Sequence, residues 1–167
     1  MRKLGLVFGF CLTQFLCIGQ TAQWKIGDTL PNFAYDGQFA RDYQLSDLKG
    51  SYVLVHYWAS WNEESRKLQI SFIDLFGRYK ERRFKLGRKF NIISIALDDN
   101  PEILDLAWQK DNLPWKSKFC DFKGWKSPLI IQSKISQIPA NYLLNQNGII
   151  MGVNLKKEQL EEILRSL

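Results

Sequence analysis

Cysteine, a strong nucleophile, and histidine, the commonest general base, are scarce in this chain. It has 167 residues, with three cysteines and a single histidine, His56. Cys11 and Cys17 lie in an apolar N-terminal run, which leaves Cys120 as the one thiol of the remaining chain. One histidine excludes a metal centre built from several histidines, and three cysteines are too few for a disulfide scaffold. We expect neither a metal nor another cofactor.

Cys120 has two interpretations. Lysines at 116, 118, 123 and 126 favour its thiolate, whereas the adjacent Asp121 and aromatic residues oppose it. The thiol is then either a reactive group that forms mixed disulfides or a small apolar side chain packed beneath a loop. We favour the packed side chain, because cysteines outside disulfides are among the most buried residues in proteins.

The first 22 residues have the pattern of a secretory signal peptide. Arg2 and Lys3 precede an uncharged apolar run from Leu4 to Gly19, and small residues follow up to Ala22. The run is short for a membrane span, so we expect residues 1–22 to be removed and the protein to be exported, to the periplasm or another extracytoplasmic space. The alternative is an uncleaved membrane anchor. Lipid attachment at Cys17 is disfavoured because the residues before it are bulky.

The remaining residues, 23–167, have the composition of one globular domain. The chain is 46% hydrophobic and 24% charged, with a formal net charge of +6. Arg78–Lys89 holds seven basic residues and one acid. This run either contacts an anionic surface weakly or is a solvated helix end that complements the helix dipole before Gly87. We favour the helix end and expect no nucleic-acid partner.

Hydrophobic patterning predicts an α/β fold, with a central mixed sheet and helices on both faces. A continuous apolar run predicts a buried strand at 52–59, and a 3.6-residue stripe predicts a helix starting near Asn62. Asn100 and Pro101 predict the start of a second helix. Asn147-Gly148 predicts a hairpin turn, and Asn154 is expected to cap the last helix. The remaining expected elements are a strand at 91–97 and hairpin strands at 140–144 and 149–153.

Several of these segments together resemble the thioredoxin-like superfamily. HYWASWNEES at 56–65 resembles the signature in which a strand leads into C-x-x-C at a helix start. GDTLPNF at 27–33, ISIALDD at 93–99 and IPANYLLNQNGII at 138–150 continue the match. The match is to exported thiol-disulfide oxidoreductases and alkyl hydroperoxide reductase–thiol specific antioxidant (redoxin) proteins. It implies a thioredoxin-like fold over residues 23–167.

The same resemblance implies a degenerate active site. The two cysteine positions of C-x-x-C fall on Asn62 and Ser65, with Glu63 and Glu64 between them. Thiol–disulfide exchange needs a thiolate, and neither an amide nor an unactivated hydroxyl replaces it. His56 falls where many relatives keep a buried acid. We consider it a buried structural histidine rather than a base acting on Ser65.

Pro139 matches the family's cis-proline, which implies a cis Ile138–Pro139 bond in a loop that receives a partner chain. A turn that is preserved because folding needs it would explain the same proline equally well. The remaining groove would be formed by Trp61, Glu63, Glu64, Ile138 and Pro139. We therefore expect a binding or accessory protein without dithiol catalysis, whose partner is an unidentified protein or peptide. The alternative is a thiol-disulfide oxidoreductase or peroxide-reacting protein that uses Cys120.

Overall fold

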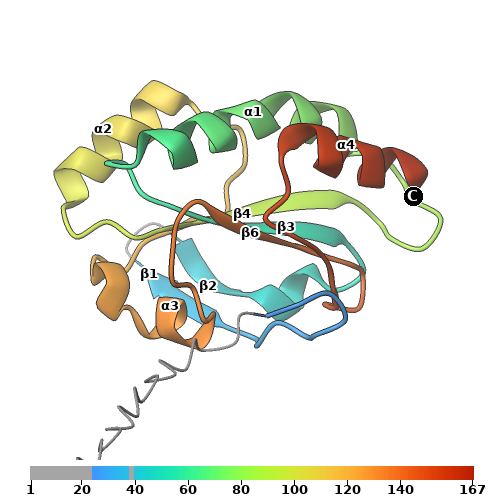
Figure 1. Ribbon diagram of the computed structural model, residues 1–167, viewed down its shortest axis with the longest axis horizontal. Coiled ribbons are helices and arrows are strands. Elements are labelled where there is room, and N and C mark those ends of the chain that lie inside the picture. Colours follow the sequence, from blue (N-terminus) through green and yellow to red (C-terminus); the bar gives the residue numbers. More distant parts are fainter. Residues whose placement is uncertain (1–23, 38–39) are drawn as a thin grey trace, which may run out of the picture.

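The computed structural model describes residues 24–37 and 40–167. These residues form a five-stranded mixed sheet with helices on both faces, which confirms the predicted α/β architecture (Figure 1). The expected signal peptide lies outside the described residues. Among the described residues, no helix is long and apolar enough to cross a membrane.

The sheet is built around its central strand. Its order is β5 (Lys118–Phe119), β4 (Phe90–Ala96), β3 (Tyr52–Trp58), β6 (Ala140–Leu144) and β7 (Ile150–Val153). β3 runs parallel to β4 and antiparallel to β6. Because β3 and β4 are parallel, the chain must return along the sheet between them, and it does so through a long helix.

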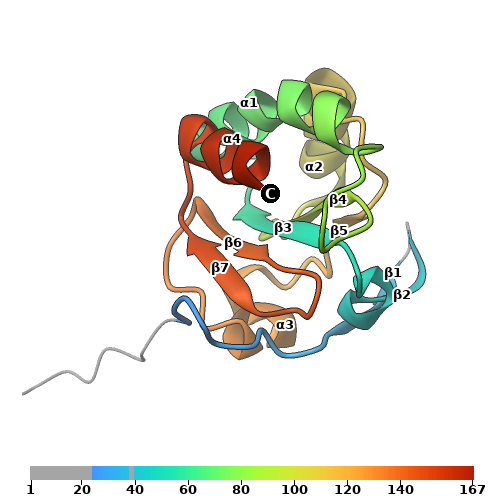
Figure 2. The ribbon, with the colours of Figure 1, turned by 90° about the vertical axis from the view of Figure 1, so that its right-hand side faces the viewer.

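The two faces of the sheet are covered differently. α1 (Glu63–Tyr79), α2 (Pro101–Asp111) and α4 (Lys157–Ser166) lie on one face, and α3 (Pro128–Gln132) lies on the other (Figures 1 and 2). The antiparallel hairpin of β1 (Ala34–Gly37) and β2 (Ala40–Gln44) lies on the α3 side. Two short 3-10 helices complete the chain, η1 (Leu45–Leu48) and η2 (Gly124–Lys126).

Alternating side chains of β3 supply both halves of the core. Val55 and Tyr57 pack with residues of α3 and the N-terminal segment, whereas Leu54 packs with Phe72 of α1 and with α4. All seven residues of β3 are buried, as expected for a central strand covered on both faces. This packing fixes the end of β3, from which the candidate site begins.

The predicted helix starts at Asn62 and Asn100 are confirmed, because both residues are N-caps. The predicted cap at Asn154 is wrong: α4 starts from Lys156, and Asn154 pairs with Asn141 instead. The basic run was expected to be a helix end reaching Gly87, and this is also wrong. α1 ends at Tyr79, and residues 80–89 form an irregular connection to β4.

Candidate functional site

The turn between β3 and α1 is organised by Asn62. Its side-chain Oδ1 accepts a hydrogen bond from the main-chain N–H of Ser65, at 2.8 Å. This is the usual N-cap arrangement, in which a side chain satisfies one of the first amide groups of a helix. One of the unpaired N–H groups at the start of α1 is therefore already bonded to the side-chain amide of Asn62.

Ser65 lies one turn into α1 and is fully buried. Its hydroxyl donates to the main-chain oxygen of Asn62, at 3.0 Å, and accepts from the main-chain N–H of Ala59, at 3.4 Å. Both hydrogen bonds close the turn. The hydroxyl proton therefore points at a carbonyl group, and no side chain of the turn accepts it as a general base would.

Asp98 fastens the same turn to the end of β4. Its carboxylate accepts the main-chain N–H of Ser60 at 3.0 Å and also accepts the Ser60 hydroxyl. Burial raises the pKa of Asp98, while the hydrogen bonds from Ser60 act in the opposite direction. The link between two loops 38 residues apart holds the start of α1 against the sheet.

His56 lies in β3 beneath the start of α1. Its Nε2 atom is 3.4 Å from the main-chain oxygen of Ser65, and its ring packs edge-on against Phe72. Burial lowers the pKa of His56 to about 4, although the carbonyl groups of Ser65 and Ala140 oppose this shift. The ring is neutral at pH 7, and its contact is to the carbonyl of Ser65 rather than to the hydroxyl.

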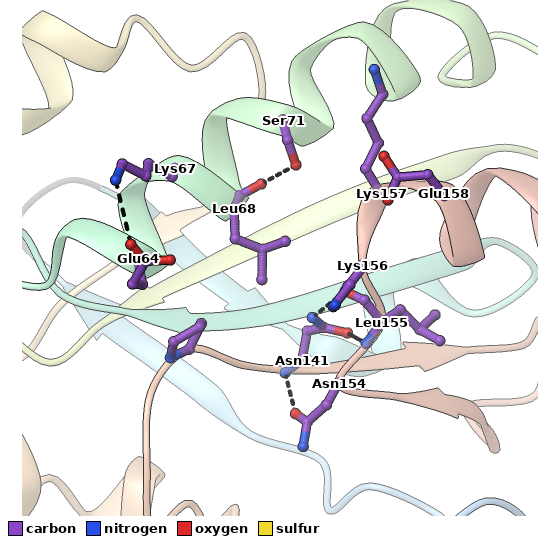
Figure 3. A pocket seen from close by; sticks show the side chains of 11 residues that line it. Glu64, Lys67, Leu68, Ser71, Asn141, Asn154, Leu155, Lys156, Lys157 and Glu158 are labelled. Carbon is purple, nitrogen blue, oxygen red and sulfur yellow. Dashed lines mark hydrogen bonds and ion pairs between the residues drawn. The ribbon is translucent and has the colours of Figure 1, made fainter.

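A groove of about 470 Å³ opens beside the cis Ile138–Pro139 peptide bond. The cis geometry agrees with the prediction. Leu68, Pro139 and Leu155 give the groove an apolar surface, and Leu68 points from α1 toward the strand that carries Asn141 (Figure 3). Charged and polar side chains complete the lining: Glu64, Lys67, Ser71, Asn141, Asn154, Lys156, Lys157 and Glu158.

Asn141 holds one wall of this groove in place. Its side-chain Nδ2 donates to the main-chain oxygen of Leu155 at 3.0 Å, and its Oδ1 accepts the Leu155 N–H at 2.9 Å. The Oδ1 of Asn154 also accepts a hydrogen bond from the main-chain N–H of Asn141, at 3.2 Å. Sequence inspection missed Asn141, since nothing local indicates that its amide fastens the β7–α4 connection.

Trp61 borders a second hollow on the other side of the α1 start. This hollow has a volume of about 680 Å³, and Trp61 and Trp125 line it with 57% and 44% of their surfaces exposed. Phe122, which adopts a positive φ of 55°, forms part of the wall. The remaining lining residues are Leu97, Asp99, Lys123, Gly124 and Lys126.

The predicted groove residues are thus divided between these surfaces. Glu64 and Pro139 line the groove, whereas Trp61 lines the second hollow. Glu63 is exposed and pairs with Lys67 at 2.8 Å, which lowers the pKa of Glu63. Ile138 is partly buried and packs against the core on the α3 side.

Cys120 lies in neither lining. It is 3% exposed and packs with Trp58, Leu104 and Ala107, on the side of the sheet covered by α2. Its thiol donates to the main-chain oxygen of Asp98, at 3.4 Å. Burial raises the pKa of Cys120 to about 11, so the thiol is protonated at neutral pH. Within residues 24–37 and 40–167, no group of three His, Cys, Asp or Glu side chains is placed to hold a metal ion.

No protein-family model matches the chain. It is 26% identical over 182 residues to the thiol-disulfide oxidoreductase ResA of Bacillus cereus, covering all of this chain and 99% of that protein. A thiol-disulfide oxidoreductase structure from Bacteroides fragilis matches with a TM-score of 0.72 and 27% identity, over 83% of this chain and 98% of that one.

A further solved structure supports the assignment of the chain to a family. It is the C-terminal domain of a protein from Bacteroides thetaiotaomicron described as a thiol-disulfide oxidoreductase. It matches with a TM-score of 0.73 and 30% identity over 85% of this chain and 95% of that domain. Together with the match to ResA, this similarity extends over nearly the whole domain. The chain belongs to the thioredoxin-like thiol-disulfide oxidoreductase family.

Proposed function

We propose that this protein is a non-catalytic member of its family, which binds extended polypeptide segments without exchanging disulfides. The observation that carries the proposal is the start of α1, where Asn62 and Ser65 bond to each other and to Ala59. We place these two residues at the positions where the family carries C-x-x-C. The side chains that remain there stabilise the turn and have no sulfur.

The chemistry of exchange supports this proposal. A thiolate attacks a disulfide sulfur, and the N-terminus of a helix stabilises that thiolate by its partial positive charge. Here the Asn62 side chain accepts one N–H of the same helix end, that of Ser65, and the first turn carries two acids, Glu63 and Glu64. An amide oxygen is not a nucleophile toward sulfur. The Ser65 hydroxyl is buried and donates to a carbonyl.

Catalysis by Cys120 instead would require a different site. Its thiol is buried, has a raised pKa and packs against α2. The residues that line the groove at Pro139 are absent from this cluster. A partner disulfide bound in that groove would therefore not meet the Cys120 sulfur.

The groove itself suits a polypeptide. Leu68, Pro139 and Leu155 offer apolar contacts, and Glu64 and Lys156 add charges of opposite sign at its edge. Trp61 lies exposed beside the same helix start. Exposed tryptophans and apolar pockets with polar edges are typical of protein-binding surfaces. We also propose that residues 1–22 direct export and that binding takes place outside the cytoplasm.

An unfolded protein whose cysteines are all alkylated tests this function, because it cannot form a mixed disulfide. We expect the alkylated protein to bind the full chain. Its affinity for the Leu68→Ser and Trp61→Ala variants should be about tenfold lower, because truncation of an important contact residue costs more than about 1 kcal/mol. Leu106→Ser, which alters an exposed leucine on α2, is the matched control. Absence of binding, or equal binding by all variants, would overturn the proposal.

A further inference from the structure

The basic segment between α1 and β4, residues 80–89, has a defined conformation that the proposed binding function does not use. Phe84 is buried in the core, stacks on Tyr79 and meets the ring of Tyr52 edge-on. The Phe84 N–H donates to the Gly87 oxygen at 3.0 Å, which closes a tight turn. A side chain at position 87 would lie within 2.5 Å of the Tyr52 ring, so this close approach requires glycine.

Leu86 lies at the tip of this turn and faces solvent. It is 73% exposed, the highest value among the large apolar side chains of the described residues. The turn on which it stands is fixed to the core by Phe84. The backbone of the turn is thus fixed to the core, while most of the Leu86 side chain is exposed to water.

Cations flank this leucine. Arg83, Lys85 and Arg88 are exposed and form no ion pair within residues 24–37 and 40–167. By contrast, Arg78 is paired with Asp74 and Glu161, and Lys89 is paired with Glu81. The tip therefore carries uncompensated positive charge around one apolar side chain.

We propose that residues 83–88 dock the protein on an anionic phospholipid surface, with Leu86 entering the acyl boundary and Arg83, Lys85 and Arg88 contacting headgroups. Basic residues near an anionic leaflet attract it, and apolar side chains add affinity by burial. A nucleic acid or a sulfated glycan complements the cations equally well but leaves Leu86 in water. The leucine therefore favours lipid over the other polyanions.

The position of the tip has a consequence for the groove. Tyr52 pairs with Phe90, so the segment before β4 lies at the end of the sheet where β3 begins. α1 starts from the opposite end of β3, and Figure 1 shows the two at opposite ends of the sheet. The strand between them is about 20 Å long. A protein docked by residues 83–88 therefore presents its groove away from the lipid surface.

Two variants of the full chain test the proposal in a vesicle sedimentation assay. The vesicles contain either phosphatidylcholine alone or an equimolar mixture with phosphatidylglycerol. We expect R83Q/K85Q/R88Q to abolish the preference for the mixed vesicles. Each cation contributes about fivefold to the affinity, so the loss of all three should lower binding to these vesicles about a hundredfold. Leu86→Ser, which leaves the charge unchanged, should lower binding to the mixed vesicles about tenfold. The apolar run from Leu4 to Gly19 is the same in every variant.

Matched controls remove the same charge and the same side chain elsewhere. Lys25→Gln/Lys110→Gln/Lys116→Gln and Leu106→Ser alter exposed residues away from the tip and should bind like the wild type. Hydrogen exchange of the amides at 84–87 should slow only with the mixed vesicles. If Leu86→Ser binds normally while the triple variant does not, the tip is a general polyanion site and the lipid proposal is overturned. Unchanged exchange at 84–87 would overturn it as well.

Discussion

The side-chain oxygen of Asn62 lies 2.8 Å from the main-chain nitrogen of Ser65, and the hydroxyl of Ser65 lies 3.0 Å from the main-chain oxygen of Asn62. The two residues thus satisfy each other at the first turn of α1. Positions that a redox relative would use for electron exchange serve here, in our proposal, to stabilise a helix start. Because these hydrogen bonds stabilise the start of α1, substitutions that remove them should lower the free energy of unfolding.

Replacing Asn62 by alanine removes the cap of α1. We expect Asn62→Ala to lower the free energy of unfolding by about 1 kcal/mol, because the Ser65 N–H loses its acceptor. Urea denaturation measures this change. Asn62→Ser is the matched control, since serine also caps helices well and should retain most of the stability. Equal stabilities of the alanine and serine variants would show that the cap contributes nothing.

Cys120 should be almost unreactive in the folded protein. With a pKa of about 11, about one thiol in a thousand is ionised at pH 8, and the side chain is buried. In a Cys11→Ser/Cys17→Ser background, an aromatic disulfide reagent should react with Cys120 slowly in buffer and rapidly in urea. Similar rates in both conditions would support the peroxide- or disulfide-reacting alternative.

Local signals explain what could be predicted from the sequence. Asn62 and Asn100 are recognisable caps because their partners lie within three residues. The Asn147-Gly148 turn is similar, since Gly148 has the positive φ that such a turn needs. The resemblance to a known family added the cis bond before Pro139, which local propensity alone would not indicate.

Contacts between distant segments could not be predicted in the same way. The Ser60–Asp98 bond joins the loops that follow β3 and β4, and the Asn141 amide accepts the N–H of Leu155, 14 residues later. Asn154 has a cap-like signal, but its side-chain Oδ1 accepts the main-chain N–H of Asn141 on β6. The basic segment looked like a helix end, yet the burial of Phe84 against Tyr52 draws the chain into a turn. Tertiary packing decided each case.

His56 should make the stability of the protein depend on pH in the acid range. Its pKa is about 4 in the folded state against 6.5 in the unfolded chain, so the unfolded state binds more protons between these values. The stabilising contribution is complete above pH 6.5 and is lost as the pH falls toward 4. The loss reaches about 3 kcal/mol at pH 4.

Urea denaturation of the wild type and His56→Gln at pH 7, 5.5 and 4 measures this contribution. The difference in unfolding free energy between the two proteins should shrink by about 3 kcal/mol over the series. The titration of Asp98 is common to both proteins and cancels in the difference. A constant difference would show that His56 is not held neutral by burial.

Asn141 should be a major contributor to the wall of the groove. Asn141→Ala leaves the buried N–H and the oxygen of Leu155 without their partners, so we expect a loss of about 2 kcal/mol in unfolding free energy. Asn141→Asp keeps an acceptor for the Leu155 N–H and, when it is protonated at acid pH, a donor to the Leu155 oxygen, so it should lose less there than at pH 7, where a buried carboxylate opposes that oxygen. Hydrogen exchange at the Leu155 amide should rise more in the alanine variant than in the aspartate variant. The reverse order would contradict the assigned hydrogen bonds.

The most direct test of the proposed loss of exchange is the reduction of insulin by dithiothreitol. We predict that the wild-type chain accelerates this reaction no more than its Cys120→Ala variant does. The Asn62→Cys/Ser65→Cys variant should accelerate it clearly, because a pair of thiols is then restored at the start of α1, while either single cysteine should not. Failure of the double variant would contradict the placement of Asn62 and Ser65 at the exchange positions. Acceleration by the wild type well above Cys120→Ala would contradict the account itself.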